Sequence, residues 1–114
     1  MSHPRRSART LWLGALAALI LSAGSAFADV IDGNWCHADG RRLSIRGEEI
    51  VTPRGNKLTG NYTRHFFDYV TPADEPGAGQ TVYLILLSEY AMESRLGTRD
   101  APAQTWRRCS ADVS

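Results

Sequence analysis

The sequence predicts an all-β protein: a small antiparallel β-barrel or sandwich of about 6–8 short strands with one disulfide, after an N-terminal signal peptide. Short runs of alternating apolar and polar residues are separated by Gly, Pro, Asn and Asp, which punctuate strands. No stretch shows the 3.6-residue period that an amphipathic helix requires. The only two cysteines lie near the two ends of the patterned region, so one bridge would join the ends of a single domain.

Residues 1–28 have the three-part layout of a secretory signal peptide. Arginines come first, the apolar run 11–21 follows, and Ala26 and Ala28 offer the small residues that a signal peptidase reads. The apolar run is shorter than the roughly 20 residues that cross a bilayer. We therefore expect cleavage after Ala28, a single β domain over residues 29–114, no stable membrane span, and a periplasmic or secreted location in a bacterium.

Cys36 and Cys109 both survive this predicted cleavage. An exported compartment is oxidising, and two thiols in one small domain predict one structural disulfide. There is no Cys-x-x-Cys motif of the kind used by redox-active pairs. In the chain-entropy picture, a loop of this length contributes roughly 4 kcal/mol of stability, which a small domain needs.

The individual elements follow from the alternation and its interruptions. We expect strands at residues 31–36, 42–46, 49–52, 57–59, 61–70, 81–90 and 104–109, loops at 71–80 and 96–103, and either a continued sheet or a turn at 92–95. In the second strand, Leu43 and Ile45 alternate with polar residues. Asp39-Gly40 marks the turn before it and Gly47 ends it. The most apolar run, 81–90, is expected to be the central strand.

The composition excludes several functional classes. The arginines of the predicted signal peptide account for the net charge of +1, so the remaining domain is slightly acidic and has no electrostatic footprint for nucleic acid. Ser44, Ser88 and Ser94 lie in strand-like runs without the flanking glycines of a nucleophile elbow, and no glycine-rich phosphate loop precedes a helix. His37 and Asp39 are too few to form a metal site. We therefore expect no enzyme activity, no metal and no cofactor.

The start of the predicted domain resembles calycin-type barrels, the group of lipocalins, avidins and small bacterial metalloprotease inhibitors. Residues 33–35 match the Gly-x-Trp of their first strand, and residues 58–62 (LTGNY) add an avidin-like pattern. The resemblance implies a barrel in which Trp35 packs across the closed end. The metalloprotease inhibitors are also similar in size, compartment and single disulfide. Biotin binding is not implied, because His37 and Arg41 stand where avidins have small polar residues.

The aromatic residues are the best functional signal in the sequence. Most are expected to fill the core and hold strands in register. In residues 61–70, however, aromatics occupy both alternating faces, with Tyr62 and Phe66 on one and Phe67 and Tyr69 on the other. One face of a small antiparallel sheet normally meets water, so some of these rings are expected to contact a partner. The candidate contacts on this segment are Tyr62, Arg64 and Phe66.

The loop 71–80 is the second candidate for recognition, because loops on a rigid sheet often bind partners. Asp74 and Glu75 are expected at its tip, where they would favour a partner with a basic rim; the alternative is a solvated connector. We therefore expect a small exported binding domain whose partner is another exported or envelope protein, or an enzyme that it inhibits. The alternative function is binding of a small apolar ligand inside a barrel, which requires a cavity instead of a filled core.

Overall fold

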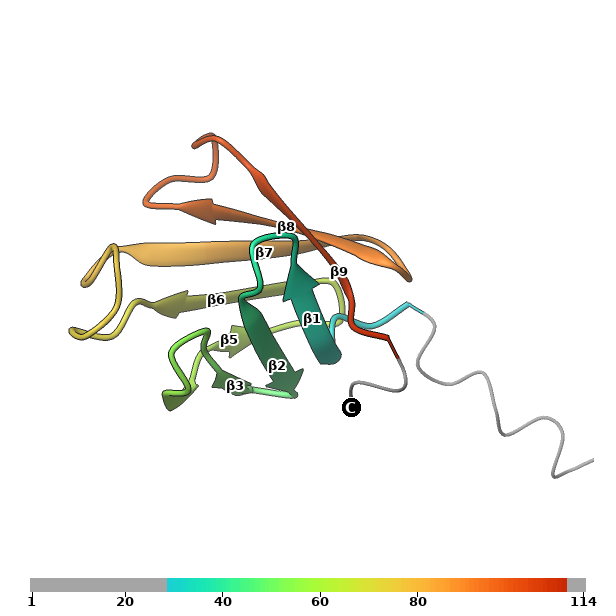
Figure 1. The fold of residues 1–114 in the computed structure, drawn as a ribbon, viewed down its shortest axis with the longest axis horizontal. Helices are drawn as coiled ribbons and strands as arrows, with labels where there is room; N and C mark the ends of the chain where they lie inside the picture. Colours follow the sequence, from blue (N-terminus) through green and yellow to red (C-terminus); the bar gives the residue numbers. More distant parts are fainter. Residues whose placement is uncertain (1–28, 111–114) are drawn as a thin grey trace, which may run out of the picture.

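The computed structural model describes residues 29–110, and all regular structure in this range is β (Figure 1). The strands are β1 (Gly33–His37), β2 (Arg42–Arg46), β3 (Glu49–Val51), β4 (Lys57–Thr59), β5 (Asn61–Tyr62), β6 (Phe66–Val70), β7 (Thr81–Ser88), β8 (Ala91–Leu96) and β9 (Gln104–Arg108). All of the strand pairs are antiparallel. The predicted all-β class is confirmed. The predicted signal peptide, residues 1–28, lies outside the described residues.

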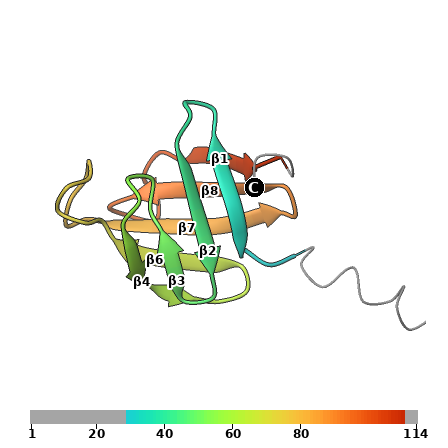
Figure 2. The same ribbon diagram turned by 60° about the horizontal axis from the view of Figure 1, so that its bottom comes forward.

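The strands form one sheet that curls into a nearly closed barrel. Their hydrogen-bonded order is β4-β3-β2-β1-β9-β8-β7-β6-β5. β4 and β5 stand at opposite ends of this order, yet only Gly60 separates them in the chain. One continuous segment therefore pairs with β3 through its first half and with β6 through its second, which brings the sheet edges together. Figure 2 shows β1 to β4 crossing in front of β6 to β8.

Gly60 lies at the point where this segment changes partners. Its N–H donates to the Glu48 carbonyl at 2.9 Å, which continues the pairing with the β2–β3 hairpin. A Cβ at this position would lie 2.4 Å from the Asp68 carbonyl oxygen and 2.5 Å from the Phe67 ring. Glycine is therefore required here because two backbone segments approach each other closely.

The β1–β9 pair is the hydrogen-bonded strand pair that joins β1–β4 to β5–β9. The pair extends over only three residue positions, centred on Cys36. The Cys36–Cys109 disulfide crosses this seam with a Cα–Cα distance of 5.1 Å and a sequence separation of 73, so the predicted bridge is confirmed. Because its neighbour Trp35 faces the core, Cys36 faces outward, and the bridge reinforces the seam from outside the barrel.

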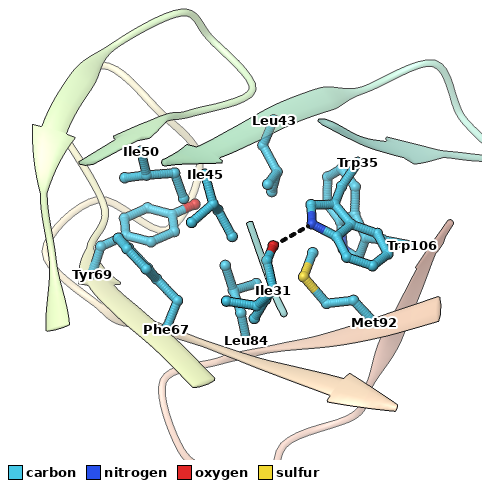
Figure 3. Packing of buried hydrophobic residues seen from close by; sticks show 10 residues of the cluster. All are labelled: Ile31, Trp35, Leu43, Ile45, Ile50, Phe67, Tyr69, Leu84, Met92 and Trp106. Atoms are coloured by element: carbon cyan, nitrogen blue, oxygen red, sulfur yellow. Dashed lines mark hydrogen bonds between the residues drawn. The ribbon is translucent and has the colours of Figure 1, made fainter. Parts of the chain in front are cut away.

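Buried hydrophobic side chains from both halves of the barrel meet in one core (Figure 3). The cluster consists of Ile31, Trp35, Leu43, Ile45, Ile50, Phe67, Tyr69, Leu84, Met92 and Trp106. The Trp35 side chain is completely buried, as predicted, and its Nε1–H donates to the Ile31 carbonyl at 2.8 Å. Leu43 and Ile45 both face this core, which confirms the alternation expected for β2.

The single strand predicted for residues 61–70 is wrong. A tight turn separates β5 from β6, and in it the Thr63 N–H donates to the Phe66 carbonyl at 2.8 Å. The turn contains neither Gly nor Pro, and the aromatic residues on both sides of it are typical of a continuous strand, so the sequence did not indicate a turn. Tyr62 consequently packs edge-on against Phe67, with ring centroids 6.5 Å apart, while Phe66 lies on the outer wall. The expectation that Tyr62 and Phe66 share a face is therefore also wrong.

The most apolar run forms β7, the longest strand of the described chain, and it lies between β6 and β8. The prediction of a central strand does not apply to this fold, because a sheet that curls into a barrel has no central strand. The segment at 92–95 continues the sheet instead of turning at its rim, since it belongs to β8. The loops expected at 71–80 and 96–103 begin and end close to the predicted positions.

Candidate functional site

One end of the barrel is plugged by the chain that precedes β1. Ile31 is completely buried there, and its N–H donates to the Arg64 carbonyl in the β5–β6 turn at 2.8 Å. Its carbonyl accepts the Trp35 indole hydrogen bond. The Ile31 backbone thus hydrogen-bonds to the β5–β6 turn and to Trp35. The Ile31 side chain occupies the interior at this end of the barrel.

Arg108 completes this closed end. Its guanidinium carbon lies 4.3 Å from the centroid of the Trp35 ring, a cation–π arrangement. The guanidinium donates to the backbone carbonyls of Val30 at 2.6 Å and Glu89 at 2.7 Å, and also to the Asp32 carbonyl. Burial lowers the pKa of Arg108 from its usual value. The Arg108 guanidinium therefore has backbone acceptors within the fold and is not available to bind a ligand.

The opposite end is open, and we call it the mouth. Four connections border it: residues 38–41, 52–56, 71–80 and 97–103. They surround a cavity of about 470 Å³, which is within the range of about 300–1,000 Å³ typical of small-molecule sites. Its apolar floor is formed by the inward faces of the core residues Leu43, Tyr69, Leu84 and Trp106.

Arg41, in the β1–β2 connection, is held rigidly at the edge of this cavity. Its Nε donates to the Asp39 carboxylate at 2.8 Å, and a terminal nitrogen donates to Gln104 Oε1 at 2.8 Å. Its guanidinium carbon lies 5.0 Å from the centroid of the Trp106 ring. Backbone and side-chain hydrogen bonds from Arg41 lower the pKa of Asp39, so this pair stays ionised near neutral pH.

Two further arginines line the cavity. Arg95 donates to the Glu93 carboxylate at 2.9 Å and to the Ala101 carbonyl at 2.7 Å. Arg54 is exposed in the tight turn after β3, which closes with the Gly55 N–H donating to the Thr52 carbonyl at 2.8 Å. Among residues 29–110, Arg54 has no hydrogen-bond or ion-pair partner. Of the three arginines that line the cavity, it is therefore the one without a carboxylate partner.

Glu75 ties two of the bordering loops together. Its carboxylate accepts hydrogen bonds from Thr52 Oγ1 and, at 2.7 Å, from Asn56 Nδ2. The same Asn56 amide donates to Asp74 Oδ1 at 2.9 Å. Glu75 is only 8% exposed, so it lies inside the mouth instead of at the exposed loop tip that the sequence suggested. The loop 71–80 is thereby fastened to the β3–β4 turn.

Two hydroxyl groups lie in the cavity wall, those of Thr71 and Tyr69, and the Thr71 hydroxyl lacks the partner that a buried polar group usually has. Thr71 is 5% exposed, and its Oγ1 is buried with no hydrogen-bond partner within the described chain. Burial, together with the nearby Glu75 charge, raises the pKa of Tyr69 to about 12. Both hydroxyls therefore stay protonated at neutral pH and can donate to a group that enters the cavity.

The structure distributes the predicted partner-binding residues over different regions. The Tyr62 hydroxyl donates to the Asp32 carboxylate, which raises the pKa of Tyr62, and Arg64 pairs with the Asp29 carboxylate; both lie at the closed end. Phe66 is 47% exposed on the outer wall. Asp74 and Glu75 lie at the mouth. The five residues do not form one site, and partner binding by any of them stays a prediction.

The sequence did not predict the three arginines and Trp106 as one site; Arg41 was noted only as a difference from the avidins. They come from connections and strands that are far apart in the chain, and no local motif joins them. Only the mixture of arginines with turn residues at positions 41 and 54 is visible in the sequence, and arginines in turns are usually just solvated.

Known proteins do not identify this chain: comparisons with family models, curated proteins and solved structures find no match. Within residues 29–110, no three His, Cys, Asp or Glu side chains come close enough together to hold a metal ion. A search of the same residues finds no helix long and apolar enough to span a membrane. The class of protein is defined by its fold alone, a small disulfide-bonded antiparallel barrel with one plugged end and one open end.

Proposed function

We propose that this protein binds a small organic molecule in the mouth of its barrel. The observation that carries the proposal is the cavity of about 470 Å³ with an apolar floor and polar groups around its edge. Apolar surface drives a ligand into such a site, and a few directed polar groups orient it. A hollow of about 580 Å³ also lies at the plugged end, lined by Asp32, Arg46 and Arg108, but it is more open to solvent than the mouth, and its Arg108 is already bound to backbone carbonyls.

The loops at the mouth are connected before any ligand arrives, which favours binding. Glu75 connects the loop 71–80 to the β3–β4 turn, and Arg41 connects the β1–β2 connection to Gln104 on β9. A site that is already ordered loses less conformational entropy on binding than one built from free loops. Three prolines in the cavity wall, Pro53, Pro76 and Pro102, restrict the backbone further.

Export to the periplasm or the medium is part of this proposal. The Cys36–Cys109 bridge supports it, since disulfides persist mainly in oxidising compartments. The layout of residues 1–28 as a signal peptide supports it independently. A protein in this location would meet small molecules that enter from outside the cell.

Binding of another exported or envelope protein is the second candidate function. One observation favours it: Phe66 and Val70 on β6 are 47% and 58% exposed on the outer wall, where Phe66 is paired with Ile85 of β7. Exposed aromatic and aliphatic groups of this kind are enriched at protein interfaces. This surface is separate from the mouth, so the two functions can be tested separately.

The neutral fluorescent probe phenyl naphthylamine tests the proposal, because its emission rises when it enters an apolar site. The protein is purified after export, with its disulfide intact. The variant Val82→Trp places a large ring in the mouth, because Val82 lines the cavity next to Tyr69, its cross-strand partner on β6. The matched control is Val70→Trp, which adds the same ring on the outer wall of the neighbouring strand.

We expect saturable binding to the wild type and to Val70→Trp, and at least about tenfold weaker binding to Val82→Trp, provided that both variants melt cooperatively. Equal affinity in all three proteins would overturn the mouth as the binding site. Binding that survives Val82→Trp but is lost in Phe66→Ser would assign the probe to the outer wall, in favour of the second candidate function.

A further inference from the structure

We infer that the ligand of the mouth is an organic anion, with an apolar body and one acidic group, and that Arg54 binds the acidic group. This inference rests on the proposed function and names the class of ligand for the same cavity. The acidic group can be a carboxylate or a sulfonate, since a guanidinium recognises the oxygens of either.

The charged residues in the cavity wall favour an anion. They are Arg41, Arg54, Arg95 and Glu75, so positive groups outnumber negative ones. The Glu75 carboxylate keeps its negative charge, because Thr52 and Asn56, which donate to it, are neutral. The preference for an anion therefore rests on the local attraction of Arg54, the lining arginine without a carboxylate of its own, which partial exclusion of water from a concave site strengthens.

Arg54 differs from the other two arginines in what it contacts. Arg41 is paired with Asp39, and Arg95 is paired with Glu93, so each of these cations has its own carboxylate. No carboxylate of residues 29–110 pairs with Arg54. Hydrogen bonds from Thr52 and Asn56 join the β3–β4 turn to the loop 71–80. They hold the backbone of Arg54, which lies between them in the chain, at the cavity edge. A ligand anion would supply the missing partner.

The Trp106 ring in the floor is already covered by other groups, which argues against a cationic ligand on this ring. Ammonium ligands are usually held against the open faces of aromatic rings. Here the Arg41 guanidinium already lies 5.0 Å from the centroid of the Trp106 ring, and the His37 ring packs on the same indole at 5.1 Å. A ligand cation would therefore be placed beside an arginine. The unpaired Thr71 hydroxyl, by contrast, can donate a hydrogen bond to an anion.

A pair of probes with nearly the same rings separates charge from shape. Anilinonaphthalene sulfonate carries a negative group that phenyl naphthylamine lacks. In Arg54→Gln the cation is removed at the mouth. In the control Arg46→Gln, one exposed arginine is removed from β2 near the closed end, so both variants lose the same net charge. Arg54→Lys keeps the charge but loses the planar fork.

We expect the wild type to bind the sulfonate about tenfold more tightly than the neutral probe, with an affinity that falls as salt is added. Arg54→Gln should weaken sulfonate binding about tenfold and leave the neutral probe unchanged. Arg46→Gln should change neither, and Arg54→Lys should recover part of the loss. A cationic amphiphile, decyltrimethylammonium, should displace the sulfonate less well than decanoate does.

The outcomes distinguish this inference from the proposed function. If the neutral probe binds in the mouth but the sulfonate binds no more tightly and ignores Arg54→Gln, the anion inference is overturned and the mouth site stands. Displacement by decyltrimethylammonium as effective as displacement by decanoate also overturns it. If neither probe responds to Val82→Trp, the proposed function and the inference fail together.

Discussion

The two ends of the barrel contain the same pair of residue types in opposite situations. At the closed end Arg108 stacks on Trp35, and at the mouth Arg41 stacks on Trp106. Arg108 donates to backbone carbonyls of the plug, whereas Arg41 donates to two side chains, Asp39 and Gln104. The buried Ile31 of the chain before β1 fills one end, whereas the connections at the other end surround a cavity of about 470 Å³.

This difference indicates that the plug, residues 29–32, and not the barrel wall, determines which end is available for binding. The wall is the same antiparallel ring at both ends. Where residues 29–32 lie across it, polar groups are satisfied internally and the interior is filled by Ile31. At the mouth, the cavity remains and a hydroxyl, Thr71 Oγ1, stays without a partner. Stability is therefore expected to depend mostly on the closed end and binding on the mouth.

The largest effect is expected for Trp35→Ala. Because this side chain is fully buried and packs against both the plug and Arg108, its removal should lower the free energy of unfolding by about 3–5 kcal/mol. At the mouth, Val82→Ala removes a much smaller side chain that already borders the cavity, and it should cost about 1 kcal/mol. Urea unfolding of both variants measures the difference. If Trp35→Ala lowers the free energy of unfolding by less than about 1 kcal/mol, the stability of the protein does not depend mostly on the closed end.

The disulfide is expected to have the next largest effect. Replacing both Cys36 and Cys109 by serine should lower the free energy of unfolding by roughly 2–4 kcal/mol, because the barrel seam then depends on three residue positions alone. Thermal melts of the double variant, and of the wild type with and without reductant, check this. An unchanged melting temperature in the double variant would show that the β1–β9 hydrogen bonds suffice to close the ring.

Gly60→Ala probes the second closure of the barrel, where β4 continues into β5. The added Cβ would meet the Asp68 carbonyl oxygen at 2.4 Å, so either the bend or β6 must shift. We expect a loss of about 1–3 kcal/mol, as for other overpacked positions. The control is Thr59→Ala, an exposed neighbour, which should stay within about 0.5 kcal/mol of the wild type. If both variants unfold at the same urea concentration, the close approach at Gly60 does not constrain the barrel.

The smallest expected effect is alkaline destabilisation through Tyr69 at the mouth. Its pKa is raised to about 12 in the folded protein against 10.0 ordinarily, so the unfolded chain loses this proton first. Its contribution to stability is complete below about pH 10 and is lost as the pH rises toward 12. Because the residue borders the cavity, we expect a loss of about 1–2 kcal/mol. In Tyr69→Phe the decline over this range should be smaller by that amount; the same decline in both proteins would refute burial of the hydroxyl.

Much of the barrel could be predicted from local patterns. Alternation at Leu43 and Ile45 places one face of β2 in the core, and the glycines and prolines fall between strands. The disulfide followed from cysteine count and compartment. The turn between β5 and β6 was missed because residues 63–65 carry no Gly or Pro, and dense aromatics on both sides are typical of a continuous strand.

The mouth could not be predicted because its residues meet only after the ring closes. Arg41, Arg54 and Trp106 belong to three separate parts of the chain, and their proximity depends on the β1–β9 seam. Glu75 shows the same limitation. From sequence it is one of two adjacent loop acids, which are usually solvated. It is buried here only because Thr52 and Asn56, about twenty positions earlier, donate hydrogen bonds to it.

The two indoles of residues 29–110 provide the most direct test, because Trp35 reports on the closed end and Trp106 on the mouth. Their Nε1–H groups donate to the Ile31 carbonyl and to Ser94 Oγ, so each should give a separate resonance in proton–nitrogen correlation spectra. On titration with anilinonaphthalene sulfonate, we predict that the Trp106 signal shifts to saturation while the Trp35 signal stays in place. A shift of Trp35 as large as that of Trp106, or saturable binding with neither signal moving, would contradict the account.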